Sequence, residues 1–379
     1  MTNSCKSPWA GIFIETDGKV KSCCAGAYYW GNLHDNSIEE IINGEKAQAI
    51  RQEIINDVPS SYCLGCRRDE ERTGYSLRSY YDQFTLTQDQ LAAADTFIPR
   101  NLDIRWNALC NLNCVYCNEF SSTKWQKIKG IPVELTERAY YDNLLDYIEQ
   151  HSQDIEILLL VGGEPLLPKQ NVRLLKSLDE DIHIDVISNL SVDLDSNAVF
   201  QQLKNKTKVG WKISAETIGQ RFEYVRHGAK WDKFVSNLKA IKLLPGHQIT
   251  LLPVYCIYSA TNLVELYEFV NELGIQIHWQ NLWGPEYQNL ANFSKPVRDL
   301  AIAEIDRALA LPYIDKFDRG MNRTFLETMR SQLSAVDSET NCNQQFLLWC
   351  TEYEVKHTEH LPEFAEIWLD LYKVIKYDL

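Results

Sequence analysis

The sequence lacks a run of about 18 apolar residues, and its first residues lack the charged-then-apolar layout of a signal peptide. The first absence excludes a transmembrane helix, so we expect no membrane partner. The second favours a cytoplasmic protein, in which disulfides are rare. The 379 residues also contain no tandem repeat and no low-complexity tract, and 45% of them are apolar. Such a chain has enough apolar surface to bury a sizeable core.

Positive charge is scarce as well. The chain has 38 Lys and Arg against 52 Asp and Glu, a formal net charge of -14. Arginines gather between residues 67 and 78, but Asp69, Glu70 and Glu71 lie among them. A nucleic-acid binder usually shows a basic face, because phosphate contacts supply its affinity. We therefore expect no nucleic-acid partner, and a peptide or small-molecule substrate fits better.

Cysteine is abundant and unevenly placed. Of 11 cysteines, five lie in residues 5–66 and three in residues 110–117, while the last three stand alone. Clustered cysteines in a protein without an export signal more often bind metal than form disulfides. The two groups predict two metal centres in two modules.

Residues 1–80 are predicted to form a small α+β module. Ala10–Glu15 and Lys19–Cys23 flank Asp17-Gly18, a hairpin turn signal. Helices are expected from Asn36 or Ser37 through Ile42 and from about residue 45 to 55. Residues 81–99 are interpreted as a polar connection.

From residue 100 the pattern alternates between strand and helix. Strands are predicted at Leu102–Trp106, Ile155–Val161, Ile182–Ser188, Val209–Ala215, Ile249–Ile257 and Ile275–Trp279, and helices at residues 134–150, 171–179, 195–204, 231–243 and 262–273. Six βα units in series predict an α/β domain over residues 100–290, built on a parallel sheet that is either a partial barrel or doubly wound. Residues 291–379 are predicted to be a C-terminal helical region.

Three cysteines follow the first of these strands: Cys110, Cys114 and Cys117, spaced Cys-x3-Cys-x2-Cys. Thiolates suit iron–sulfur clusters or zinc. Three ligands leave one iron of a four-iron cluster open for chemistry, and a loop after a barrel strand lies on the active face. Structural zinc is the alternative, but it requires four ligands and no fourth lies close in sequence.

Other polar residues end the later strands. The second strand ends in Gly162-Gly163-Glu164-Pro165, where glycines permit close backbone approach and Glu164 supplies a carboxylate for an ammonium group. Polar strand ends are typical of barrel active sites, and alternation would place some of them on one face. The residues concerned are Asn189, Lys212, Ser214 and Glu216, with Arg226 further along. The alternatives are a turn residue for Asn189 and a surface charge for Arg226.

The cysteine spacing, with Tyr116 before the third cysteine, resembles the signature of the radical S-adenosylmethionine (SAM) superfamily, and the resemblance spans residues 100–280. It implies a partial (β/α)6 TIM barrel and a [4Fe–4S] cluster that binds SAM and cleaves it to a 5′-deoxyadenosyl radical. By the same resemblance, Tyr116 lies near the adenine and Gly162, Gly163 and Glu164 hold the SAM amino group. Asn189, Ser214 and Glu216 contact the ribose or the substrate, and Arg226 pairs with the SAM carboxylate.

The N-terminal cysteines resemble the twitch module, a short relative of the SPASM domain. The resemblance implies an auxiliary [4Fe–4S] cluster on Cys5, Cys23, Cys63 and Cys66, with Cys24 as the alternative to Cys23. The module commonly follows the barrel, whereas here it precedes it. A four-cysteine zinc site is the alternative.

Three functions remain open. The first is modification of a ribosomally made peptide by crosslinking, epimerisation or splicease-type excision, with a flavodoxin or ferredoxin as reductant and a small peptide-recognition protein as a further partner. The second is dehydrogenation of a small molecule, and the third is a non-catalytic iron–sulfur or zinc scaffold. Lys212 and Glu216 are candidate catalytic residues. Cys256, expected in the fifth strand, is either a hydrogen-atom donor or a buried small hydrophobe.

Overall fold

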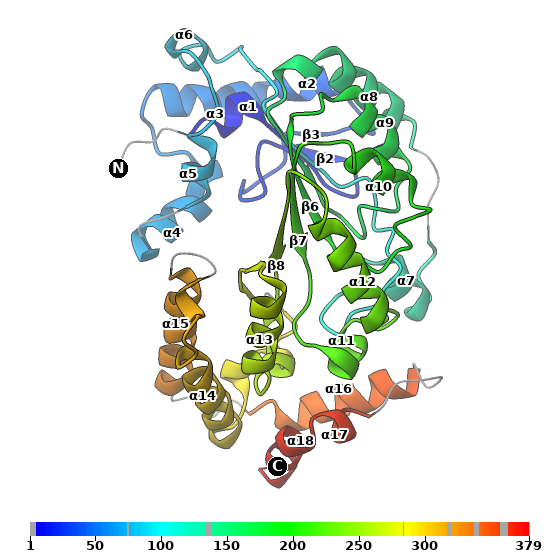
Figure 1. Ribbon diagram of the computed structural model, residues 1–379. Coiled ribbons are helices and arrows are strands. Elements are labelled where there is room, and N and C mark those ends of the chain that lie inside the picture. Colours follow the sequence, from blue (N-terminus) through cyan, green and yellow to red (C-terminus); the bar gives the residue numbers. More distant parts are fainter. Residues whose placement is uncertain are drawn as a thin grey trace.

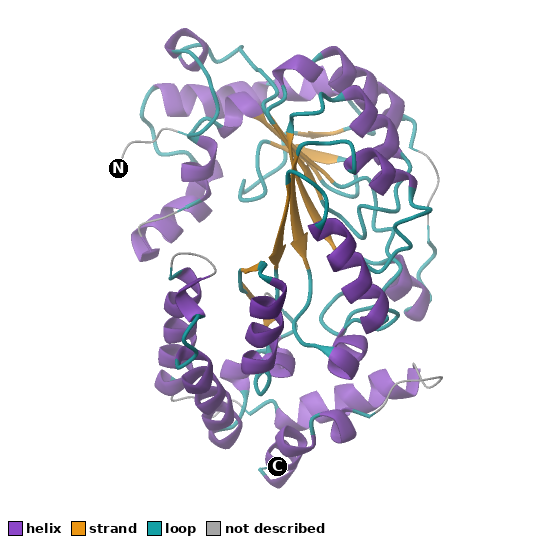
Figure 2. Ribbon diagram, viewed as in Figure 1, coloured by secondary structure: helices purple, strands orange, loops and turns teal. Residues whose placement is uncertain are grey.

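The computed structural model describes residues 5–73, 76–133, 138–282, 284–316, 320–336, 341–356 and 363–378. Eleven strands are assigned in these ranges: β1 (Gly11–Ile14), β2 (Lys19–Lys21), β3 (Gly31–Asn32), β4 (Asn101–Ile104), β5 (Ile157–Leu160), β6 (His183–Ser188), β7 (Lys208–Ile213), β8 (His247–Leu251), β9 (Val254–Tyr255), β10 (Gln276–Ile277) and β11 (Gln280–Asn281). Figure 2 shows the strands gathered at the centre, with helices around them.

The helices fall into three groups along the chain. The N-terminal group is α1 (Ser7–Ala10), α2 (Ile38–Ile42), α3 (Glu45–Ile55), α4 (Leu64–Thr73), α5 (Leu77–Tyr81) and α6 (Gln88–Leu91). The middle group is α7 (Thr123–Ile128), α8 (Tyr140–Gln150), α9 (Gln170–Ser177), α10 (Ala198–Leu203), α11 (Gly219–Val225), α12 (Trp231–Lys242) and α13 (Leu263–Leu273). The C-terminal group is α14 (Lys295–Leu309), α15 (Met321–Ala335), α16 (Asn343–Lys356), α17 (Phe364–Ile367) and α18 (Leu369–Tyr377).

One sheet carries the fold, with strand order β10-β8-β7-β6-β5-β4-β1-β2-β3. Neighbouring strands from β4 through β8 to β10 are all parallel. These six strands correspond to the six predicted βα units, which confirms an α/β fold with a partial barrel. Helices α8, α9, α10 and α12 lie along one side of the sheet (Figure 1).

The burial pattern separates the two faces of the sheet. In β5, with the sequence Ile-Leu-Leu-Leu, the side chains on the helix side are buried. Those on the other side are buried or half-buried. In β6 and β7, buried residues alternate with half-exposed ones, because one face packs under the helices and the other does not. We call this second side the concave face.

The N-terminal module joins the same sheet. Strand β1 pairs in parallel with β4, from Gly11 opposite Asn101 to Ile14 opposite Ile104. Strand β2 returns antiparallel after the predicted turn, where Gly18 has a φ of 81° that favours glycine. The module and the barrel are therefore linked by backbone hydrogen bonds along β4, the strand that leads into the three-cysteine loop.

The predicted fifth strand was wrong beyond Leu251. Strand β8 ends there, and β9 pairs with β11 in a separate two-stranded sheet. Pro253 explains the break, since proline has no N–H for the sheet ladder. Cys256 accordingly lies outside the barrel strand, at the start of a short 3-10 helix (Ile257–Ser259), where it is fully buried.

Some expected elements fall partly outside the described residues. They are the helix start at 134–137 and residues 317–319, 337–340, 357–362 and 379 of the C-terminal region. The expected connection over residues 81–99 contains the short helix α6. In the part of the chain that the structure describes, no helix combines the length and apolar character needed to cross a membrane.

Candidate functional site

The three-cysteine loop follows β4 and is held by α7. Trp125 Nε1 donates to the carbonyl of Cys114 at 3.0 Å, and Thr123 Oγ1 accepts from Cys110 N at 3.3 Å. Cys114 is buried, while Cys110 and Cys117 are half-buried. Burial raises the pKa of Cys110 to about 11, and the charge of Cys117 adds to that rise. Burial raises the pKa of Cys114 as well, and the charges of Cys117 and Cys110 add to that rise.

Two side chains from later in the chain, Asn189 after β6 and Arg226 after α11, reach these sulfurs. Asn189 Nδ2 lies 3.8 Å from Cys110 Sγ, and Arg226 Nη1 lies 3.7 Å from Cys114 Sγ, both placed to donate hydrogen bonds. Asn189 also donates to Asn111 Oδ1 at 2.9 Å, which fixes its amide. Donors aimed at sulfur favour the thiolate form that metal binding requires.

The predicted glycines allow the loop after β5 to lie against the cysteine loop. A Cβ on Gly163 would stand 2.3 Å from the carbonyl oxygen of Leu109, and Gly162 has a φ of 124°. The next residue, Glu164, donates its N–H to that same carbonyl at 2.8 Å. Only glycine permits this approach, so both residues position the backbone that precedes Cys110.

Glu164 joins the ends of β5 and β6. Its carboxylate accepts from Ser188 Oγ at 2.8 Å, Asn189 N at 2.8 Å and Leu166 N at 3.1 Å. The side chain is 1% exposed, and burial raises the pKa of its carboxyl to about 7. The expected carboxylate at the strand end is present, and its hydrogen bonds also hold Asn189 at the first sulfur.

Arg226 and Glu216 form a buried ion pair beside the same loop. Arg226 Nε and Nη2 donate to the Glu216 carboxylate at 2.9 and 2.6 Å. Nη2 also donates to Tyr116 Oη. The exposed fractions are 5% for Arg226 and 0% for Glu216, and the Glu216 charge raises the pKa of the guanidinium well above its ordinary value. The pair ties Cys114 and Tyr116 to the segment after β7.

Lys212 and Ser214, the remaining predicted site residues, are not part of the Arg226–Glu216 ion pair. Lys212 Nζ makes a 2.7 Å ion pair with Asp185 on the concave face. Strand β7 ends at Ile213, so Ser214 and Glu216 follow the strand and are not placed by its alternation. Ser214 N donates to the Ser188 carbonyl at 3.1 Å.

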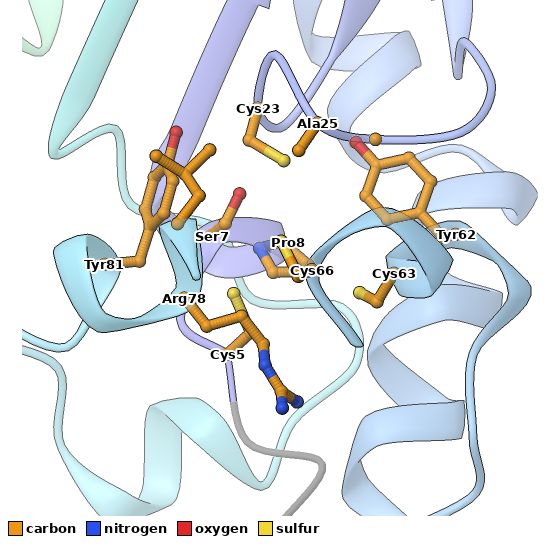
Figure 3. A pocket seen from close by; sticks show the side chains of 12 residues that line it. Cys5, Ser7, Pro8, Cys23, Ala25, Tyr62, Cys63, Cys66, Arg78 and Tyr81 are labelled. Atoms are coloured by element: carbon orange, nitrogen blue, oxygen red, sulfur yellow. The ribbon is translucent and has the colours of Figure 1, made fainter. Parts of the chain in front are cut away.

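The N-terminal cysteines surround one cavity (Figure 3). Its lining includes Cys5 before α1, Cys23 after β2, Cys63 at the end of a 3-10 turn (Ser61–Cys63) and Cys66 in α4. The cavity holds about 300 Å³ between protein atoms, counting its opening to solvent. Burial raises the pKa of Cys63 to about 12, with further increases from the charges of Cys23 and Cys66. Cys24 does not line the cavity and is exposed.

Sequence reasoning missed a row of side chains on the concave face. The strand register aligns Phe13, Asp103, Leu159, Asp185 and Gly210 from β1 to β7. Gly210 leaves room for the Asp185 carboxylate, because a Cβ there would stand 2.3 Å from Asp185 Oδ1. The signal was available: the charged residues Asp103 and Arg105 stand two apart, in β4 and directly after it.

Asp103 and Arg105 carry unused hydrogen-bonding capacity. Asp103 is 6% exposed, and its Oδ1 lies 3.1 Å from Arg105 Nη1 without hydrogen-bond alignment. Neither atom has a hydrogen-bond partner among the described residues. Tyr80 of α5 donates to Asn101 Oδ1 at 2.9 Å. Burial raises the pKa of Tyr80, and the charges of Asp185 and Asp103 add to that rise. The N-terminal module thus holds Tyr80 against the first residue of β4.

We expect the stability of the protein to depend on pH through Asp103. Burial raises the pKa of its carboxyl to about 6, from 3.8, so the folded state holds the proton more tightly than the unfolded chain. The stabilisation is full below pH 4 and is lost as pH rises through 6, about 3 kcal/mol in all. Urea unfolding at pH 4 to 7 measures the free energy of unfolding. As pH rises over this range, the Asp103→Asn variant should become more stable relative to the unsubstituted chain by up to that amount. Parallel stability curves for the two would contradict the prediction.

Comparison with known proteins gives two family matches. The radical SAM superfamily model matches residues 106–270, and SPASM, described as an iron–sulfur cluster-binding domain, matches residues 5–67. A 7-carboxy-7-deazaguanine synthase of Methanocaldococcus jannaschii is 22% identical over 165 residues, 41% of this chain and 63% of that protein.

Solved structures show weak similarity. Streptococcus suis SuiB bound to S-adenosylmethionine has 14% identity and a TM-score of 0.41, covering 70% of this chain and 63% of that one. Native anSMEcpe with bound AdoMet has 15% identity and a TM-score of 0.39, covering 53% of this chain and 58% of that one. The chain thus spans less than two thirds of the length of the relatives named here.

Proposed function

This chain belongs to the radical SAM superfamily, and we propose from that premise that it cleaves SAM reductively and removes hydrogen from a peptide. The observation that carries the proposal is the gathering of three thiols with sulfur-directed donors from Asn189 and Arg226. When bound there, a [4Fe–4S] cluster with SAM on its open iron supplies an electron and a carbon radical that takes a hydrogen atom. The side chains of this protein bind and orient these groups.

Each residue around the loop has a distinct task in this proposal. Cys110, Cys114 and Cys117 hold the cluster, and the N–H groups aimed at two of the sulfurs lower their effective negative charge. Glu164 keeps Asn189 in place, while Gly162 and Gly163 bring the backbone that receives the SAM amino group against the loop.

The side chains expected to contact the nucleoside flank the same loop. Tyr116 faces the adenine, with its hydroxyl held by Arg226. Ser214 and Asn189 follow neighbouring strands and are assigned to the ribose or the substrate. Arg226, bonded to Glu216 within the chain, is assigned to positioning the loop as well as to the SAM carboxylate. Lys212, paired with Asp185, faces the substrate side.

The four thiols of the N-terminal cavity favour a second cluster. A tetrahedral zinc ion needs four sulfurs about 2.3 Å from one point. Thiolates of a four-iron cluster stand farther apart, because each binds a different iron. The four thiols that line one cavity and the SPASM match support an auxiliary [4Fe–4S] cluster.

Substitution of two adjacent cysteines tests the ligand set. We expect Cys23→Ala to lose about four of about eight irons after anaerobic reconstitution, because this thiol faces the cavity. Cys24→Ala serves as the matched control and should retain all of them, since Cys24 lies outside the cavity. Iron analysis and electron paramagnetic resonance (EPR) spectra measure both. Iron loss in Cys24→Ala alone would make Cys24 the ligand.

The peptide substrate is supported by the concave face. Asp103 Oδ1 and Arg105 Nη1 face each other as an ion pair but make no hydrogen bond among the described residues, so they could accept from the N–H and donate to the C=O of a peptide main chain. Asp103 lies on β4 and Arg105 directly follows it, between the N-terminal cavity at one end of the strand and the cysteine loop at the other. A peptide lying along this strand would pass close to the reactive end.

A small-molecule substrate is the second candidate. The observation that favours it is the match to a synthase whose name denotes a deazaguanine product. That match covers 41% of this chain. The candidates separate by product mass, because only a peptide substrate would yield a modified peptide.

Anaerobic reconstitution tests the proposal directly. The loaded protein should hold about eight irons, and with dithionite and SAM it should release 5′-deoxyadenosine and methionine. A flavodoxin or ferredoxin system should replace dithionite. Intact clusters without 5′-deoxyadenosine would overturn the radical SAM activity. Co-production with short peptides encoded beside the gene, followed by mass spectrometry, tests the substrate, and unmodified peptides alone would favour the small molecule.

A further inference from the structure

Arg78 is the one charged side chain among the described residues that line the N-terminal cavity. Figure 3 shows it entering from α5, beside Cys5 and Cys66. Its side chain is 10% exposed. A buried cation next to four thiols is not required by iron binding itself, since the thiolates alone complete the coordination of a four-iron cluster.

Glu70 of α4 holds the guanidinium in place. Arg78 Nε donates to Glu70 Oε1 at 2.7 Å, and Nη2 donates to Oε2, so the pair is bidentate. Ser76 Oγ donates to Glu70 Oε1 at 2.5 Å. Glu70 is 14% exposed. The cation is therefore oriented by two elements, and its charge is only partly offset, because the carboxylate lies on a residue that does not line the cavity.

The charge of Arg78 reaches the sulfurs. The Arg78 side chain lines the same cavity as Cys5, Cys23, Cys63 and Cys66. A buried cation beside the sulfurs stabilises negative charge on the ligands.

We propose that Arg78 is a positioning residue that raises the reduction potential of the auxiliary cluster, with Glu70 limiting the size of the rise. The inference rests on the proposed cluster in this cavity. A reduced four-iron cluster carries one more negative charge than the oxidised one. A nearby buried cation therefore favours the reduced state. The N-terminal module is in this way suited to accept an electron.

An EPR-monitored redox titration of the reconstituted full-length protein tests this. We expect Arg78→Gln to lower the midpoint potential of the auxiliary cluster by at least about 59 mV. For a one-electron couple this shift corresponds to a tenfold change in the reduction equilibrium constant. Glu70→Gln should shift it upward, because the compensating anion is gone. Arg78→Lys keeps the charge and should stay closest to the unsubstituted chain. A purely structural role would not move the potential in opposite directions.

The outcomes separate the two levels of inference. If four irons load in the cavity but Arg78→Gln leaves the midpoint potential unchanged, the role of Arg78 is overturned and the cluster is not. The same holds if Glu70→Gln shifts the midpoint potential in the same direction as Arg78→Gln. Zinc in place of iron overturns the cluster and, with it, this inference. Should Arg78→Gln fail to load iron, the sign of the shift in Glu70→Gln decides alone. The spectrum of the three-cysteine cluster in the same samples should not change.

Discussion

Cys114→Ala is expected to reduce 5′-deoxyadenosine formation to background, at least roughly 100-fold, while the auxiliary cluster stays in place. Cys114 is the buried member of the three-cysteine loop, and its sulfur accepts from Arg226. Two thiols cannot hold the SAM-cleaving cluster, so about four irons should be lost. Chromatography of 5′-deoxyadenosine and iron analysis of the reconstituted variant measure the two effects.

Cys350→Ala is the matched control. Cys350 is also a buried free thiol, 3% exposed, but it lies in α16 and belongs to neither cysteine group. It should keep its iron and its SAM cleavage. Retained cleavage in Cys114→Ala, or equal loss in both variants, would contradict the assignment of the loop.

Arg226→Met is expected to destabilise the protein by about 4 kcal/mol, because it leaves the fully buried Glu216 carboxylate without its partner. For a cooperative unit of this size that loss corresponds to a fall in Tm of roughly 5 °C. The variant also removes the hydrogen bonds to Tyr116 and to the Cys114 sulfur. Thermal unfolding and SAM cleavage should therefore decline together.

A double-mutant cycle isolates the ion pair. Replacing both partners, as Arg226→Met with Glu216→Leu, removes the uncompensated charge and should restore part of the lost stability. It should not restore SAM cleavage, since the donor to Cys114 remains absent. A double variant less stable than Arg226→Met would show that the pair is not coupled as its geometry indicates.

Local signals in the sequence were sufficient for much of the fold. Apolar runs separated by helical periods predicted the parallel strands, because the face of such a sheet that packs under helices must be apolar. The failure at Ile249–Ile257 came from treating an apolar run as one strand despite Pro253. The position of Asp17-Gly18 also predicted the hairpin whose first strand turned out to join the barrel.

The three-cysteine loop and the N-terminal cysteines show where sequence information ends. Spacing by itself predicted one centre for Cys110, Cys114 and Cys117, since eight neighbouring residues cannot place three thiols far apart. It did not separate Cys23 from Cys24, because adjacent residues point to different sides only once β2 is paired. Only the tertiary structure decided that Cys23 faces the cavity. It also brought Arg226 to Glu216 and Cys114, and Arg78 to Glu70, because contacts between residues distant in the chain arise from packing and leave no periodic trace.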